Sequence, residues 1–309
     1  MEAMNSYITI GDYEFNNCHS FKTTKSWKNL VQNASIKMHN IAGMLGAIKV
    51  GDPVEIYAGY DGMERNKEFI GYVSEILPTT PVEIRCEDEM WQLRQKTVSG
   101  SWPSITLTNL LKYLVPSAKV ECPDVVLSPF RLDAVTTTRA LQILKDEYLL
   151  TIYFRDKTLF AGLPYIEKGL PEIVYHFQKN ALAKGLIYKH KADLKVKVKA
   201  ISLLPDNKHI TKEYGDSDGD MTTLHFYNKT EKELDVLAPE QLNRMKYDGY
   251  RGTFRSLGGY PFCDHSYTLW LEDDLYPERE QGVFADLVVT DYGPDGYNRT
   301  ITPGRKIAA

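Results

Sequence analysis

The sequence lacks any long hydrophobic run: no apolar stretch reaches the roughly eighteen residues that a membrane-spanning helix needs. Its first residues, MEAMNSYITIGDYEF, contain neither a basic nor an apolar stretch. We therefore expect no signal peptide, synthesis in a cytoplasm and no insertion into a membrane. The formal net charge is only -4 and the isoelectric point is near 6.0. This small charge predicts no direct sequence-specific binding to nucleic acid.

Cysteine is also scarce. The four cysteines are Cys18, Cys86, Cys122 and Cys263, and none forms a CxxC or CxC pair. Such spacing is typical of small buried apolar residues in a reducing compartment, with one or two disulfides as the alternative.

The sequence contains no GxSxG, HExxH or phosphate-loop pattern. It does contain two carboxylate clusters, Glu87-Asp88-Glu89 and Glu272-Asp273-Asp274. Adjacent residues of a strand point to opposite faces, so neither cluster alone places two carboxylates across a cleft, as glycoside hydrolysis requires. We interpret both as solvated turns, or the first as the acidic start of a helix.

Three aspartates, Asp216, Asp218 and Asp220, match positions one, three and five of a calcium-binding loop. Met221 then stands where that loop needs glycine, and Tyr227 where it needs a bidentate glutamate. The match fails, and a flexible acidic loop is the better interpretation, with adventitious cation binding as the alternative.

The stretch Cys263-Asp264-His265 is compact, but a zinc site needs three or four convergent ligands and no partner pair is spaced nearby. The sequence therefore predicts no catalytic, cofactor-binding or metal-binding residues and no cofactor. We expect a protein that is not an enzyme, although residues far apart in sequence can assemble a triad.

The first part of the chain has a strong β pattern. In GDPVEIYAGYDG, alternation from Pro53 to Ala58 predicts a strand between glycine turns rather than a phosphate-binding loop, which would need a helix behind its glycines. The same alternation predicts strands at 7–10, 35–38, 68–76 and 82–86. Short strands separated by Gly and Pro predict a small antiparallel β-barrel over residues 1–87.

The period changes after Glu87. Apolar residues at 107, 110, 111 and 114 predict a helix that begins at Thr106 and stops at Pro116. A second helix should begin at Thr136 or Thr137, and a hairpin should turn at Asp156-Lys157. Residues 88–168 are therefore predicted to form a small α+β domain.

The β pattern returns over residues 169–309, which we predict to form a second β-barrel with an inserted helix at 234–245, opened around Pro239. In one strand Val196 and Val198 alternate with Lys195, Lys197 and Lys199. We interpret that lysine face as a solvated or edge-protecting surface, with contact to a polymeric anion as the alternative. The predicted fold is mainly β, with two small barrels flanking an α+β domain.

Aromatic residues suggest interfaces, because 20 of the 309 residues are tyrosine. Exposed tryptophans would favour a carbohydrate-binding protein, and the candidates are Trp27, Trp91, Trp102 and Trp270. Trp270 lies on an alternating strand, so we expect it in the core.

Four stretches carry a resemblance to a known family: KVGDPVEIYAGYDG, FIGYVSEILPTTPVEIRCED, TTTRALQILKDEYLLTIYFRDKTLFAG and LNRMKYDGYRGTFRSLGGYPFCDHSYTLWLED. In this order they resemble the baseplate hub family of contractile phage tails. That family includes late control protein D, the T4-type and Mu-type tail hubs and the N-terminal region of VgrG spikes. The resemblance extends from about Tyr7 to Ile301.

The resemblance implies a structural role. Such hubs look like homotrimers whose two barrels per subunit make a pseudo-six-fold ring that adapts the tail tube to the central spike. Because the chain ends at Ala309, the spike is expected to be a separate protein, and tail tube and baseplate wedge proteins are the other implied partners. Made in the bacterial cytoplasm, the chain would be assembled into a virion tail or injection particle. The alternatives are a tail-associated cell-wall hydrolase and a carbohydrate-binding β protein.

Overall fold

The computed structural model describes residues 3–39, 44–127, 129–148, 150–204 and 208–307. Two compact units form: unit 1 comprises Met1–Lys184 and Thr253–Ile307, and unit 2 comprises Gly185–Gly252. Among the described residues no helix is both long and apolar enough to cross a membrane.

The largest sheet has 13 strands, and its main path runs β16-β20-β23-β22-β3-β4-β7-β6-β5-β1-β2, with β21 and β15 branching from β22. All of its strands belong to unit 1 except parts of β16 and β20, which contain the boundaries with unit 2. The bounds are β1 Met4–Ile10, β2 Tyr13–Phe15, β3 Ser20–Ser26, β4 Asn33–Met38, β5 Pro53–Tyr60, β6 Asn66–Leu77, β7 Val82–Glu87, β15 Glu172–His176, β16 Ala181–Lys189, β20 Gly249–Ser256, β21 Thr268–Glu272, β22 Gln281–Gly293 and β23 Gly296–Lys306. The short helix α1 spans Met44–Ala47.

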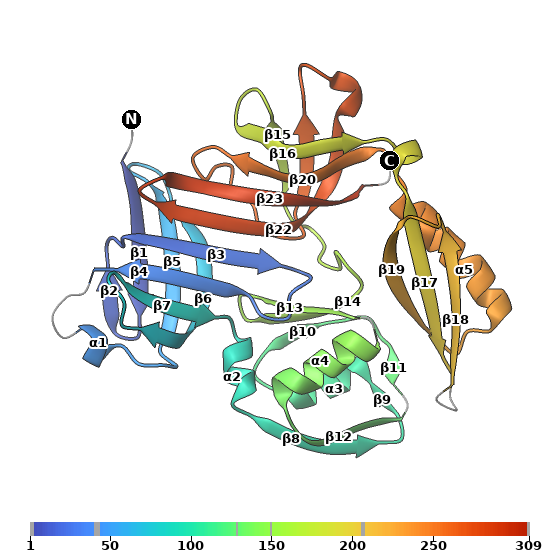
Figure 1. Cartoon of the computed structure of the whole chain (residues 1–309). Helices are drawn as coiled ribbons and strands as arrows, with labels where there is room; N and C mark the ends of the chain where they lie inside the picture. Colours follow the sequence, from blue (N-terminus) through green and yellow to red (C-terminus); the bar gives the residue numbers. More distant parts are fainter. Residues whose placement is uncertain (1–2, 40–43, 128, 149, 205–207, 308–309) are drawn as a thin grey trace. The chain divides into compact units, whose positions relative to one another are not determined.

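The first and last parts of the chain share this sheet, because β3 pairs antiparallel with β22 (Figure 1). Phe21 and Tyr292 stack across the pair with ring centroids 5.0 Å apart. Tyr292 and Tyr297 join the apolar core that the N-terminal strands build. The structure is mainly β, as predicted. No pairing in the described part of the chain closes the path into a ring, so the two-barrel arrangement stays a prediction, as do the domain boundaries.

The opening glycine-rich stretch is a strand, β5, which confirms the prediction and extends it to Tyr60. Val54, Ile56 and Ala58 are fully buried on one face, as the alternation requires. Gly51 and Gly62 have positive φ at the two ends of this segment, which glycine adopts without a steric penalty.

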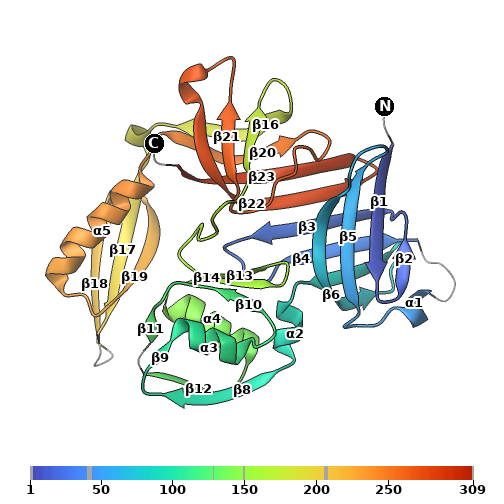
Figure 2. The ribbon, with the colours of Figure 1, turned by 180° about the vertical axis from the view of Figure 1, so that it is seen from behind.

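The α+β part of unit 1 places helices α3 and α4 side by side inside a rim of short strands (Figure 2). Thr106 and Thr136 cap these helices by accepting bonds from Asn109 and Arg139, as the sequence predicted. The hairpin β13–β14 turns at Asp156, also as predicted. The bounds are α2 Met90–Arg94, β8 Thr97–Trp102, β9 Ile105–Thr106, α3 Leu107–Leu114, β10 Lys119–Glu121, β11 Val126–Leu127, β12 Phe130–Thr136, α4 Thr137–Glu147, β13 Thr151–Arg155 and β14 Thr158–Gly162.

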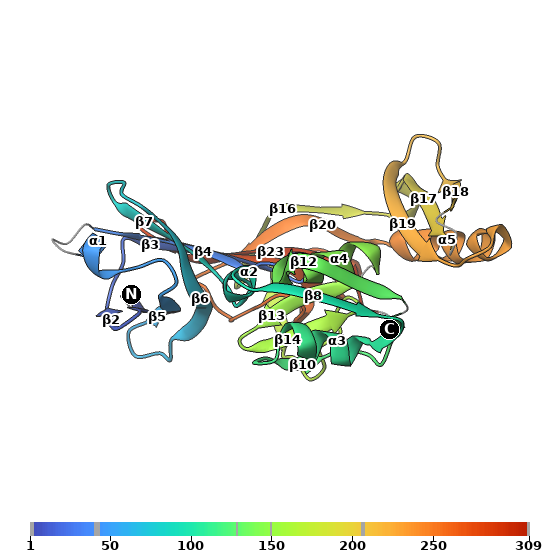
Figure 3. The ribbon, with the colours of Figure 1, turned by 90° about the horizontal axis from the view of Figure 1, so that it is seen from below.

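Unit 2 is a three-stranded sheet, in the order β18-β17-β19, with helix α5 against one face (Figure 3). The bounds are η1 Lys191–Asp193, β17 Val196–Leu203, β18 His209–Gly215, β19 Asp220–Tyr227 and α5 Glu231–Met245. The helix continues through Pro239, so the predicted opening there was wrong. Its buried residues Leu234, Ala238 and Leu242 pack with Val198 and Ala200 of β17, and this packing outweighs the lost backbone bond.

All four cysteines are free. Cys86 and Cys263 are buried, as predicted, whereas Cys18 and Cys122 are half-buried. A 3₁₀ turn, η2 Pro277–Arg279, completes the connection between β21 and β22 in unit 1.

Candidate functional site

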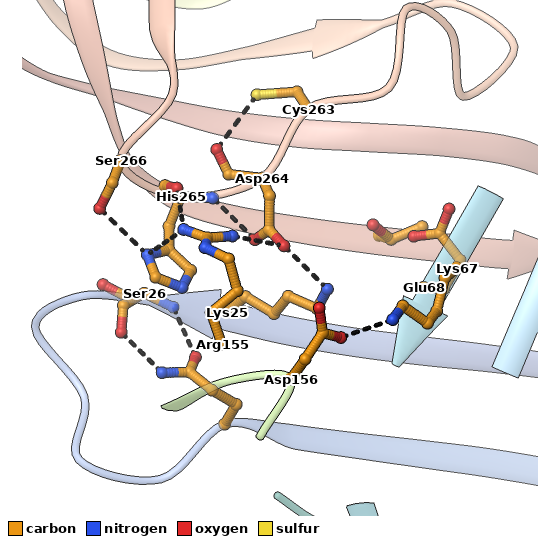
Figure 4. Close-up of polar contacts among 12 residues, drawn as sticks. Lys25, Ser26, Lys67, Glu68, Arg155, Asp156, Cys263, Asp264, His265 and Ser266 are labelled. Carbon is orange, nitrogen blue, oxygen red and sulfur yellow. Dashed lines mark hydrogen bonds and ion pairs between the residues drawn. The ribbon is translucent and has the colours of Figure 1, made fainter. Parts of the chain in front are cut away.

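A polar cluster lies where three separate segments of unit 1 meet: β3, the end of β13, and the loop before β21 (Figure 4). Asp264 lies at its centre. Its Oδ2 lies 3.0 Å from Lys25 Nζ and 3.0 Å from Arg155 Nη1. Arg155 also binds Glu167, with Nε 2.7 Å from Oε2, and donates to the His265 carbonyl at 2.7 Å. The cluster therefore connects the N-terminal, middle and C-terminal parts of the unit.

Charge pairing decides the ionisation of this cluster. Burial alone would raise the pKa of Asp264, but the charges of Lys25 and Arg155 outweigh it and hold that pKa well below its usual range. Burial alone would lower the pKa of Arg155, but Asp264 and Glu167 raise it. Asp264 is therefore held as an anion, and Arg155 as a cation.

The neighbouring sequence Asp264-His265-Ser266 contains the residue types of a hydrolytic triad. His265 Nδ1 lies 3.2 Å from Ser266 Oγ, but the Asp264 carboxylate accepts from the His265 backbone amide, not from its ring. Burial lowers the pKa of His265 to about 3, and both His265 and Ser266 are buried. A ring that holds a proton this weakly is a poor general base near neutral pH. Cys263 is no better as a nucleophile, since burial raises its pKa to about 12.

A groove of about 830 Å³ opens beside the cluster. Its lining includes the aromatic side chains of Tyr57, Phe154, Tyr260, Phe262 and Tyr267. Lys67 and Asp156 form an ion pair at 2.7 Å on its wall. The groove therefore combines apolar rings with charged side chains, among which Lys67 and Asp156 pair with each other.

The first carboxylate cluster is divided among different partners. Glu87 pairs with Arg94 at 2.7 Å, and Glu89 accepts from Tyr72. Asp88 is buried beside the groove and accepts from the amides of Gln32 and Met90, each at 3.1 Å. Burial raises the pKa of Asp88 to about 7. The interpretation as a solvated turn was therefore wrong for Asp88, which is buried. The alternative, an acidic start of a helix, is confirmed, because Glu89 is the N-cap of α2.

The second cluster holds a turn together. Asp273 is buried and accepts from Gln178 Nε2 at 2.7 Å, and Asp274 lies 3.1 Å from His176 Nε2. In unit 2, Asp216 accepts from Val196 N at 3.0 Å and pairs with Lys246, whereas Asp218 pairs with Lys195. Within the described ranges no group of three or more His, Cys, Asp or Glu could hold a metal ion.

Trp270 is 41% exposed, so its predicted place in the core was wrong. On β21, Leu269 and Leu271 point inward, and Trp270 lies over Gly282 of the neighbouring strand. A Cβ at Gly282 would come within 2.9 Å of its ring. Trp27, Trp91 and Trp102 are half-buried.

Sequence reasoning missed a second buried pair, between Glu68 of β6 and Arg299 of β23. Arg299 Nη1 donates to Glu68 Oε2 at 2.8 Å, and Arg299 Nε donates to the Gly259 carbonyl at 2.9 Å. Both charged side chains are 1% exposed. Period-two alternation with Tyr297 and Ile301 was a usable signal, because it places Arg299 on the buried face of its strand.

No protein-family profile matches the chain, and no curated protein matches it by sequence. Several solved structures match the chain in fold. The 43 kDa tail protein of prophage MuSo2 from Shewanella oneidensis is 14% identical, with a TM-score of 0.67 over 99% of this chain and 98% of that one. A tail protein from Neisseria meningitidis is 12% identical, with a TM-score of 0.67 over 99% and 97%.

A third structure is the E. coli c3393 protein, described as a component of the type VI secretion system with structural similarity to the T4 bacteriophage tail proteins gp27 and gp5. It is 9% identical, with a TM-score of 0.62 over 96% of this chain and 76% of that one. The structural neighbours are thus phage tail proteins and related secretion components. At the level of the fold, they confirm the resemblance to the tail hub family.

Proposed function

We propose, from the premise that this chain has the fold of phage tail proteins, that it is the structural hub of the baseplate of a phage tail or phage-like contractile injection system. Three copies form a ring that adapts the tail tube to a separate central spike protein and contacts baseplate wedge proteins. The observation that carries this proposal is the extent of the similarity, which spans 99% of this chain and 98% of the prophage tail protein.

The chemistry of unit 1 supports a role without catalysis. The Asp264 carboxylate is occupied by Lys25 and Arg155, and burial weakens the basicity of His265. These groups interlock three chain segments, which suits a part that must keep its shape inside an assembly.

The test is the mass of the purified full chain by light scattering at increasing concentration, followed by electron microscopy of assembled tails. A trimer of three 35.3 kDa chains, located between tube and spike, is the expected result. A chain that stays monomeric and occupies no such ring would contradict the proposal.

Carbohydrate binding is the second candidate, because the exposed ring of Trp270 could stack on a sugar. Glycan binding that Trp270→Ala abolishes would favour it. Release of fragments from purified cell walls would instead favour the tail-associated hydrolase. A trimer with neither property supports the hub.

A further inference from the structure

Four exposed apolar side chains of unit 1 lie on the turn between β21 and β22 and on the paired strands β15 and β21. Leu275 is 71% exposed, Tyr276 45%, Val174 44% and Trp270 41%. Val174 and Trp270 are direct partners across the β15–β21 pair. Large apolar side chains gathered on one surface typically mark a site of protein association.

The turn that presents Leu275 and Tyr276 is held in place before any partner arrives. Asp273 Oδ1 accepts from Gln178 at 2.7 Å and from the Leu275 amide at 3.1 Å. Gln178 Oε1 in turn accepts from the Asp274 amide at 3.0 Å. A preorganised anchor loses little conformational entropy on docking, so more of its contact energy appears as affinity.

The charge on this turn indicates the partner. Residues 272–280 carry five carboxylates and one guanidinium, a formal charge of -4. We call this segment, with Trp270 and Val174, the acidic hairpin. An apolar centre with an acidic rim is complementary to an apolar surface with a basic rim.

Unit 2 has a surface of that kind on the face of its sheet that α5 does not cover. Val198 and Ala200 of β17 point toward α5, so Lys197, Lys199 and Ile201 occupy the other face. Met221 of β19 pairs with Lys197 in the register and is 60% exposed. We call Lys195, Lys197, Lys199, Ile201 and Met221 the lysine face.

The lysine face retains positive charge after its own ion pairs are counted. Lys197 binds Glu213 at 2.5 Å, and Lys195 binds Asp218. Lys199 forms no ion pair with another described residue. Lys199 lies opposite Glu213 in the register between β17 and β18, so an incoming carboxylate would share its ammonium group with Glu213.

We propose that the acidic hairpin of one copy docks on the lysine face of a second copy of this chain. The inference rests on the proposed homotrimer. Two different, complementary surfaces on each chain make a head-to-tail contact, and such contacts close into a ring when the rotation between neighbours allows it. The hairpin supplies the apolar anchors, and its acidic rim sets the orientation and the partner.

The experiment compares the trimer midpoint concentration of full-length variants by light scattering and sedimentation equilibrium. Leu275→Glu, which places a charge at the most exposed anchor, should raise the midpoint about tenfold or more. The matched control is Val236→Glu, because Val236 is 66% exposed on α5, the opposite side of unit 2 from the lysine face. The control should shift the midpoint less than about twofold.

Charge reversal then tests the pairing of the two surfaces. Glu278→Lys and Lys199→Glu should each weaken the trimer, and the double variant should recover most of the loss. If the wild type forms trimers and all these variants match the control, this inference is wrong while the hub proposal stands. If the hairpin variants weaken the trimer but the double charge-reversal variant does not restore it, the lysine face is not the partner. A wild type that never trimerises and also occupies no ring in assembled tails overturns both proposals.

Discussion

The buried pair between Glu68 and Arg299 makes a strong prediction about stability. Replacing Arg299 with Met removes a guanidinium that serves Glu68, the Gly259 carbonyl and Thr290 Oγ1, at 2.5 to 2.9 Å. The remaining carboxylate has no route to water, because its side chain is 1% exposed. Tyr297 continues to donate to it, but a phenol brings no positive charge.

The size of the effect follows from this burial. Removing one partner of a buried pair costs about 3–5 kcal/mol, since a charge is left uncompensated in a low-dielectric interior. Replacing both partners by apolar residues is often nearly neutral. We therefore expect Arg299→Met to lower the unfolding free energy of unit 1 by about 3–5 kcal/mol, and the double variant with Glu68→Leu to lose less than the single one.

Urea unfolding followed by tryptophan fluorescence measures this directly. All four tryptophans, Trp27, Trp91, Trp102 and Trp270, belong to unit 1, so the signal reports that unit alone. The control is Arg85→Met, which breaks half-exposed pairs with Glu75 and Glu83 and should cost at most about 1 kcal/mol. An Arg299→Met variant no less stable than the control would refute the reasoning.

Three further predictions concern other sites. Burial raises the pKa of Asp88 to about 7, from about 4 in the unfolded chain, so the protonated carboxyl stabilises the fold at low pH. The unfolding free energy should therefore fall as the pH rises from about 4 to 7. Asp88→Asn should flatten this dependence in urea titrations. An unchanged slope would count against a buried, titrating Asp88. Gln281 is 3% exposed, and neither of its side-chain amide atoms has a hydrogen-bond partner in the described structure. Gln281→Leu should therefore raise the unfolding free energy by about 1–2 kcal/mol. A decrease in the unfolding free energy would show that the amide is hydrogen-bonded after all. Thr230→Ala removes the capping box of α5 and should lower protection of its amides from hydrogen exchange by about 1 kcal/mol, whereas unaltered exchange would show that the cap is dispensable.

Local features of the fold were predictable because local chemistry decides them. The caps at Thr106 and Thr136 follow from side chains that satisfy the first free amides of a helix. The strand from Pro53 follows from period-two alternation between glycine turns. Trp270 shows the limit of the same rule, since alternation tells which residues share a face but not which face another element covers.

Features that depend on distant parts of the chain were not predictable in this way. Glu68 is the extra residue of a β-bulge, since Ile56 pairs with Phe69 and Tyr57 with Lys67. The bulge lets Glu68 point inward beside Phe69, where strict alternation would place only one of the two. The Asp264 cluster likewise depends on Lys25 and Arg155, which only the tertiary fold brings near it. No local pattern contains that information.

The pairing of β3 with β22 also has a consequence for biosynthesis. Ser26 bonds to Asp286 across a separation of 260 residues, so the open edge of β3 leaves the ribosome long before its partner exists. At roughly 5–20 residues per second, that edge waits roughly 13 to 52 seconds for β22. The described part of unit 2 is one continuous segment, Gly185–Gly252, and all of it leaves the ribosome within that interval. An unpaired strand edge is prone to pair with other chains. We therefore expect the nascent β3 edge to need protection, for example by a chaperone, until β22 has been synthesised.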